Sequence, residues 1–111
     1  MQRKHLSEPW FTLIGLGIKS VEGRLDKSYF ATVQPGDVVM WYNDSMGQLR
    51  EFSTVITRVT KYKTFKAYLS KESLRRCVPA YGINTVSQGI EVYREFYSAA
   101  DEKKYGVVAF A

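Results

Sequence analysis

The chain has 111 residues, of which 45% are hydrophobic and 24% charged, and its formal net charge is +5. This length suits one compact domain, so we expect residues 1–111 to form a single domain with its own core. No stretch approaches the roughly 20 apolar residues of a membrane-spanning helix, and no apolar run of a secretion signal follows the basic N-terminus. We therefore expect an intracellular, cytoplasmic protein without a membrane partner.

The scarcity of certain residue types excludes further classes. Cys77 is the single cysteine and His5 the single histidine, so we expect neither an internal disulfide nor a zinc site. We predict no metal and no cofactor. Cys77 lies in an amphipathic segment and is expected to be a small buried side chain. The positive charge favours an anionic partner such as nucleic acid, although it serves solubility equally well.

A short strand is expected over residues 3–6, with a helix after it. Ser7 is a candidate N-cap and Pro9 an early-helix proline. Gly17 fits the residue that follows a helix in the left-handed conformation. Apolar residues at helical spacing predict the inward side of this helix: Trp10, Leu13, Ile14 and Gly17.

The next stretch, residues 19–25, places an acid between two bases. The alternation after Lys19 predicts a strand in which Ser20, Glu22 and Arg24 share one face, because residues two apart point the same way. A carboxylate beside an arginine is held ionised and oriented. The alternative is a surface ion pair on an edge strand, which contributes little to stability.

Turn and strand signals alternate through the middle of the chain. Gln-Pro-Gly-Asp at residues 34–37 is a strong turn signal. The apolar run at residues 38–42 predicts a strand buried on both faces, and residues 43–48 form a loop by composition. Residues 49–60 predict a long strand whose shifting apolar phase indicates a bulge or a barrel bend.

Helical patterns dominate the last half of the chain. Thr64 is a candidate N-cap for a helix over residues 65–70, whose apolar side continues to Pro79. Thr85 or Ser87 caps the next helix. The apolar stripe of that helix is Val86, Ile90, Tyr93 and Tyr97.

The remaining segments complete a mixed pattern. Residues 98–104 are expected to be a polar link with one helical turn, and residues 105–110 a last buried strand. Strands at the start, middle and end with helices between them describe a small α+β domain, and closure into a barrel would hide the strand edges.

Five short motifs occur in order between residue 17 and the C-terminus. They are Gly17-x-Lys19-Ser20-Val21-Glu22-Gly23-Arg24-Leu25, Pro35-Gly36-Asp37, Tyr62-x-Thr64-Phe65, Phe96-Tyr97-Ser98 and Glu102-Lys103-Lys104-Tyr105-Gly106-Val107-Val108. Together they resemble the ASCH domain, a family of the PUA-like superfamily. The resemblance implies a small mixed β-barrel of five or six strands with two to four flanking helices. It also implies a basic cleft between the first helix and the barrel.

The resemblance favours a nucleic-acid-binding module, with RNA as the preferred partner over other nucleic acids or a nucleotide-like small molecule. Lys19 and Arg24 would contact phosphate or a base edge, and Glu22 would orient Arg24 or accept from a base amino group. Exposed tyrosines would stack on unpaired bases. The predicted nucleic-acid-binding residues are Lys19, Ser20, Glu22, Arg24, Tyr62, Lys104 and Tyr105.

The alternative is a small hydrolase acting on an N4-acetylcytidine-like nucleoside or on single-stranded RNA. A related branch of the family deacetylates that nucleoside with a lysine, a threonine three residues later and a distant glutamate. Lys19 matches the lysine, but Glu22 stands at the threonine position. A carboxylate is a poor substitute for a hydroxyl nucleophile, so the catalytic candidates are Lys19 and Glu22, with Glu22 as the base for a water molecule.

Overall fold

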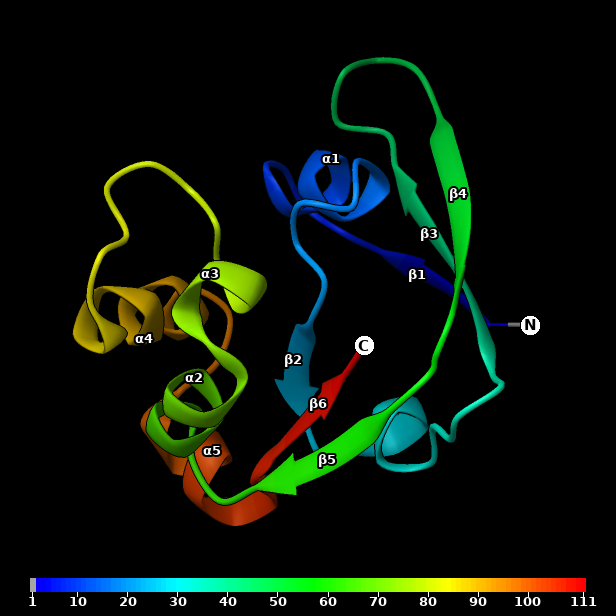
Figure 1. The fold of residues 1–111 in the computed structure, drawn as a ribbon. Helices are drawn as coiled ribbons and strands as arrows, with labels where there is room; N and C mark the ends of the chain where they lie inside the picture. The colour runs from blue at the N-terminus through cyan, green and yellow to red at the C-terminus, as the bar shows by residue number, and fades with distance from the viewer. Residues whose placement is uncertain (1) are drawn as a thin grey trace.

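The computed structural model describes residues 2–111, which form two three-stranded sheets and five α-helices (Figure 1). The first sheet has the strand order β1 (Gln2–His5), β3 (Val38–Asn43) and β4 (Arg50–Val55). The second has the order β2 (Glu22–Leu25), β6 (Val107–Phe110) and β5 (Val59–Tyr62). β1 runs parallel to β3, and the other neighbours are antiparallel. The α+β class is therefore confirmed.

The predicted long strand over residues 49–60 is two strands, one in each sheet. The ribbon leaves the first sheet after β4 and enters the second as β5 (Figure 1). At the break, the Ile56 amide donates to the Asp37 carbonyl and the Thr57 amide to the Ala111 carbonyl, both at 2.8 Å. The shift in apolar phase falls at this break, where the chain changes from one sheet to the other.

A closed barrel is not confirmed. Within residues 2–111, β1 and β4 are the edges of the first sheet and β2 and β5 those of the second, since each pairs with one neighbour. The chain itself runs from β4 into β5 along one side, whereas no described pairing joins β1 to β2 on the other side. The domain is consequently a pair of sheets that stay open along one side.

Two hydrophobic cores lie on opposite faces of the second sheet. One contains Val107 and Ala109 together with residues of the helices, and the other contains Val108 and Phe110 with residues of the first sheet. All four residues of β6 are therefore buried, which explains the unbroken apolar run of this strand. The prediction of a buried last strand is confirmed.

The helices begin where the capping residues indicate. Thr64 accepts from the Ala67 amide at 3.0 Å, and Thr85 forms a capping box with Gln88. Gly17 follows the first helix with a φ of +75°. The helices are α1 (Trp10–Gly15), α2 (Phe65–Glu72), α3 (Leu74–Cys77), α4 (Val86–Arg94) and α5 (Ala99–Tyr105), with a 3-10 turn at Ser28–Ala31.

The five helices of residues 2–111 exceed the predicted two to four. Ser73, with a φ of +86°, interrupts the predicted continuous apolar helix and separates α2 from α3. The predicted polar link at residues 98–104 is largely α5, which begins because the Ser98 side chain accepts from the Asp101 amide at 3.1 Å.

Two burial predictions hold only in part. Trp10 and Ile14 of the predicted inward side pack against the core, whereas Gly17 is exposed. The fully buried residue of the six-residue α1 is Phe11, whose ring lies 4.8 Å from that of Phe52. Ser7 does not cap α1 by its side chain. β3 is fully buried on one face and half-buried on the other, because only one face meets the second core.

Candidate functional site

A cavity of about 290 Å³ lies where the end of β1, the strand β2 and the helix α4 meet. It is lined by His5, Leu6, Ser7, Trp10, Lys19, Glu22, Gly23, Arg24, Val78, Val92, Tyr93, Phe96 and Tyr97. The cavity thus occupies the side on which the two sheets stay open. The family resemblance implies a cleft beside the first helix. In the structure α1 contributes Trp10 to the cavity lining, and α4 adds Val92 and Tyr93.

Lys19 follows the turn after α1 and is buried, with 3% of its surface exposed. Its ammonium donates to the Val21 carbonyl at 2.7 Å and to the Cys77 carbonyl, and it lies 3.4 Å from Glu22 Oε1. An ammonium has three N–H donors; two of them are used by these carbonyls, and the charge is paired with Glu22. This geometry favours a positioning role for Lys19 over the predicted direct contact with phosphate.

Glu22 opens β2 and is also buried. One carboxylate oxygen accepts from the Gly23 amide at 3.0 Å and faces Lys19, and the other accepts from Arg24 Nε at 3.3 Å. Burial raises the pKa of Glu22, but the charges of Lys19 and Arg24 outweigh it, so the pKa lies below its ordinary value of 4.5. Glu22 is therefore an ionised bridge between two cations.

Arg24 is the most accessible of the three charged side chains, with 19% of its side chain exposed against 1% for Lys19 and 9% for Glu22. Its guanidinium carbon lies 4.9 Å from the Phe30 ring centre and 5.4 Å from the Trp41 ring centre. A guanidinium has five N–H donors, and the contacts with Glu22 use only part of them. Arg24 thus combines a fixed position with spare donors.

The acid sensitivity of folding follows from the shifted pKa of Glu22. A lowered folded-state pKa stabilises the fold above the ordinary value of 4.5, and this contribution is lost as the pH falls through the folded-state pKa. We expect Glu22→Gln to be less stable than the wild type at pH 7 and to lose less stability on acidification. Urea unfolding of both proteins at pH 7, 5, 4 and 3 checks this. The difference between their free energies of unfolding cancels the contribution of the carboxylates that the two proteins share. Parallel curves would contradict the prediction.

Aromatic side chains form much of the cavity wall. The Phe65 ring stacks on the rings of Tyr93 and Tyr97, with 4.7 and 5.8 Å between ring centres. Gly23 lies against Tyr68, so closely that a Cβ atom at Gly23 would be 2.5 Å from the ring. Only glycine fits there, and its small size lets the strand β2 pack closely against Tyr68.

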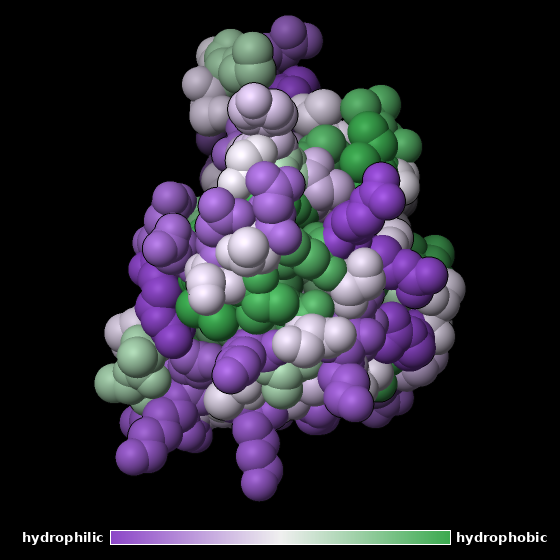
Figure 2. All heavy atoms as spheres, turned by 60° about the vertical axis from the view of Figure 1, so that its left-hand side comes forward, coloured by the Kyte–Doolittle hydropathy of each residue, from purple (hydrophilic) through white to green (hydrophobic). Residues whose placement is uncertain are grey.

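Figure 2 views the molecule from the side on which α2 to α5 lie. Hydrophobic atoms are visible in the middle of this side, with hydrophilic side chains around them. Phe96, which lines the cavity, is 52% exposed. Apolar surface is therefore accessible between charged groups on the helix-covered side.

The structure divides the seven predicted nucleic-acid-binding residues into three places. Lys19, Glu22 and Arg24 meet at the cavity. Ser20 is exposed outside β2, and its amide donates to the Arg76 carbonyl, so it does not share the face of Glu22 and Arg24 as predicted.

The other three lie in a separate hollow of about 500 Å³, which we call the Tyr105 hollow. It is lined by Tyr62, Lys63, Thr64, Ala99, Glu102, Lys103, Lys104, Tyr105 and Gly106. The Tyr62 hydroxyl donates to Glu72 at 2.5 Å, and burial together with this hydrogen bond raises the pKa of Tyr62 to about 12. The Tyr62 hydroxyl is thus already engaged by the protein.

Sequence reasoning missed several cavity residues. The pattern places Trp10, Tyr93 and Tyr97 on apolar helix faces, and Phe96 occurs only in a family motif without a role. A helical stripe that contains two tyrosines is a usable signal, because buried tyrosines need hydrogen-bond partners. Tyr93 has one, since its hydroxyl lies 2.8 Å from that of Tyr68.

The fold and the site together define a small two-sheet α+β domain with a charged, aromatic cavity at its open side. The ASCH domain matches residues 5–111, and the chain belongs to the ASCH family. None of the helices within residues 2–111 has the length and apolarity needed to traverse a bilayer.

Two solved structures are similar to this chain over nearly its whole length. The crystal structure of the hypothetical protein PH0355 is 33% identical, covers 98% of this chain and 94% of that one, and has a TM-score of 0.84. The solution NMR structure of the protein PF0455 from Pyrococcus furiosus is 35% identical, with coverages of 99% and 94% and a TM-score of 0.76. No curated protein matches the chain.

Proposed function

We propose that this protein is an RNA-binding module whose cavity holds one unpaired nucleotide of a single strand. The observation that carries the proposal is Arg24: it is fixed by Glu22, keeps spare donors and lies in the lining of an aromatic cavity. Donors of an arginine pair well with the acceptor edge of a base or with phosphate oxygens. The family assignment supports the same class of ligand.

The size and walls of the cavity suit an unstacked base better than a duplex. Ligand pockets begin at about 300 Å³, close to the cavity volume of about 290 Å³. Sequence-specific RNA recognition commonly stacks splayed bases on aromatic side chains, and Trp10, Tyr93, Phe96 and Tyr97 are available in the wall.

The charges leave one positive charge in excess, since two cations, Lys19 and Arg24, face one carboxylate, Glu22. A neutral or singly negative guest is therefore favoured over a strongly negative one. Lys19 and Glu22 act through Arg24, because their own hydrogen-bonding groups are occupied by the protein.

Arg24→Ala is expected to weaken binding by about 1–3 kcal/mol, the usual contribution of an arginine that reads a base edge. Fluorescence anisotropy with a labelled 12-nucleotide single-stranded RNA at fixed salt measures the loss. Arg75→Ala is the matched control, since Arg75 is exposed on α3, lines neither the cavity nor the Tyr105 hollow, and carries the same charge. Equal affinity of both variants, with the fold intact by circular dichroism, would contradict the role of Arg24.

The geometry gives less support to the hydrolase alternative. A general base works best with a pKa near the working pH, whereas the pKa of Glu22 is lowered. The Glu22 carboxylate already accepts from Gly23 and Arg24 and is paired with Lys19. Incubation with N4-acetylcytidine and with single-stranded RNA tests this directly. Product formation that Glu22→Gln abolishes would establish the alternative.

A further inference from the structure

We propose that the Tyr105 hollow is a second contact surface, which binds the phosphates of the strand that leaves the cavity. This inference rests on the proposed function and extends it from one nucleotide to a longer footprint. It assigns the binding of the strand to two places with different chemistry: a base in the cavity and the sugar-phosphate backbone in the hollow.

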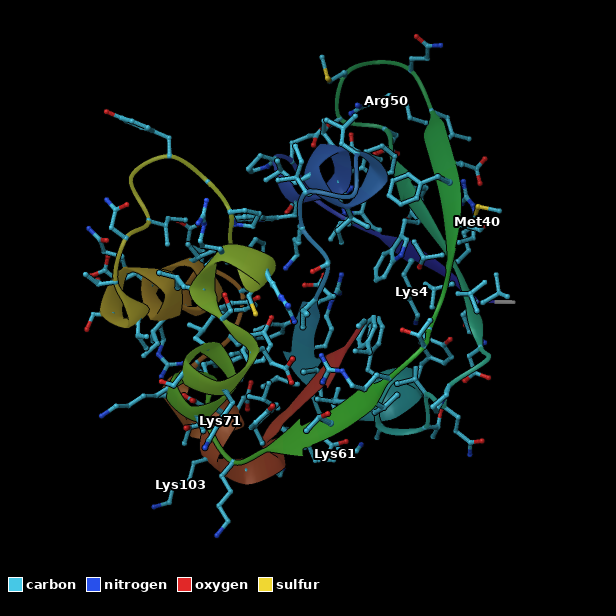
Figure 3. The ribbon with its side chains drawn as sticks, viewed as in Figure 1. Lys4, Met40, Arg50, Lys61, Lys71 and Lys103 are labelled. Carbon is cyan, nitrogen blue, oxygen red and sulfur yellow. The ribbon has the colours of Figure 1, made fainter. Side chains whose placement is uncertain are left out.

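The first argument is the concentration of unpaired lysines. Lys63, Lys103 and Lys104 line the hollow and are exposed, and within residues 2–111 none has a carboxylate within 4.0 Å. Figure 3 shows the Lys103 side chain pointing away from α5 into solvent. By contrast, Lys61 nearby is paired with Asp26 at 2.7 Å.

The second argument is that the one acid in the lining is already neutralised. Glu102 is buried, its carboxylate is paired with Arg94, and its other oxygen accepts from the Phe65 amide at 2.6 Å. Glu102 therefore does not offset the three lysines. The hollow presents a net positive surface to an incoming phosphate.

The third argument is that two lysine side chains lie close to the Tyr105 ring. The ammonium groups of Lys27 and Lys104 each lie 5.1 Å from its centre, within the range of a cation–π contact. Lys104 lines the hollow and Lys27 adds a second cation at the same ring, and phosphates that bind at lysines release the counterions of the nucleic acid. A tyrosine with two flanking lysines is thus better suited to the backbone of a nucleic acid than to a base edge.

The cavity and the hollow are near enough for one strand. Tyr97 lines the cavity and Ala99 lines the hollow, and two residues of extended chain span only about 7 Å. The connection from α4 to α5 therefore borders both surfaces. We infer that a strand with one base in the cavity passes this connection towards the lysines of the hollow.

The test uses the double variant Lys63→Ala/Lys104→Ala with two ligands, a 12-nucleotide single-stranded RNA and single nucleoside monophosphates. We expect weaker binding of the 12-mer and a salt slope reduced by about 1.4, because each phosphate contact contributes about 0.7 for single strands. Binding of the monophosphates, measured by NMR titration, is expected to stay unchanged.

The double variant Lys71→Ala/Arg75→Ala is the control, because it removes the same charge from exposed residues that line neither surface. Equal losses in both double variants would overturn the proposal and indicate general attraction of a polyanion. No change in the 12-mer would overturn it as well. Selective loss in the hollow variant without any monophosphate binding would support the hollow and contradict the cavity, so the two proposals fail separately.

Discussion

Replacing Lys19 by methionine is expected to lower the free energy of unfolding by about 3–5 kcal/mol, the usual cost of removing one partner of a buried ion pair. Methionine keeps much of the apolar length of the side chain but removes its charge. The Val21 and Cys77 carbonyls then lose their donor, and Glu22 keeps only Arg24 as a cation. Urea unfolding at pH 7 measures the loss.

Two further proteins make this result specific. Lys71→Met on the exposed side of α2 should stay within about 0.5 kcal/mol of the wild type, as surface substitutions do. The loss caused by Lys19→Met should be smaller by about 1 kcal/mol or more in a Glu22→Gln background, because no buried carboxylate then loses one of its two cations. Additive losses would show that the two residues do not depend on each other.

Replacing Phe65 by alanine is expected to cost about 3–5 kcal/mol as well, the range for a large aromatic side chain removed from a core. Phe65 is fully buried and stacks on Tyr93 and Tyr97. Because these two tyrosines line the cavity, RNA affinity should also fall although Phe65 itself does not line it. Thermal unfolding and the anisotropy titration measure the two effects.

Phe65→Leu separates packing from the position of the tyrosines. Leucine fills part of the space, so the stability loss should be clearly smaller than for alanine. Leucine has no aromatic ring, so Tyr93 and Tyr97 lose their stacking partner. An affinity equal to that of the wild type in both variants would contradict a supporting role of Phe65 for the cavity wall.

Local signals predicted much of the secondary structure. The caps Thr64 and Thr85 and the glycine at position 17 mark helix ends in the structure as they do in the sequence, because each acts on its own backbone neighbours. The predicted number of helices is too low because a single residue can end a helix. Ser73 separates α2 from α3 by its positive φ, which no sequence pattern indicates. The closure of the sheets depends on pairing between distant strands, which apolar alternation does not specify.

The candidate site was predictable in its residue types but not in its roles. Lys19 and Glu22 are close in sequence, yet one acceptor of the Lys19 ammonium is the carbonyl of Cys77, 58 residues away. That contact makes Lys19 an internal support, and only the folded chain contains it. The contribution of α4 to the cavity wall could not be predicted either, because the apolar face of a helix does not reveal which of its residues other elements leave uncovered.

The unpaired edges of β1 and β2 have a consequence for the behaviour of the protein in solution. A free strand edge is a template on which another polypeptide can add a strand and start aggregation. Both edge strands are four residues long and carry charged side chains, Arg3 and Lys4 in one and Glu22 and Arg24 in the other. Charged side chains on an edge strand oppose the addition of a further strand, and in β2 these charges are Glu22 and Arg24, which also line the cavity.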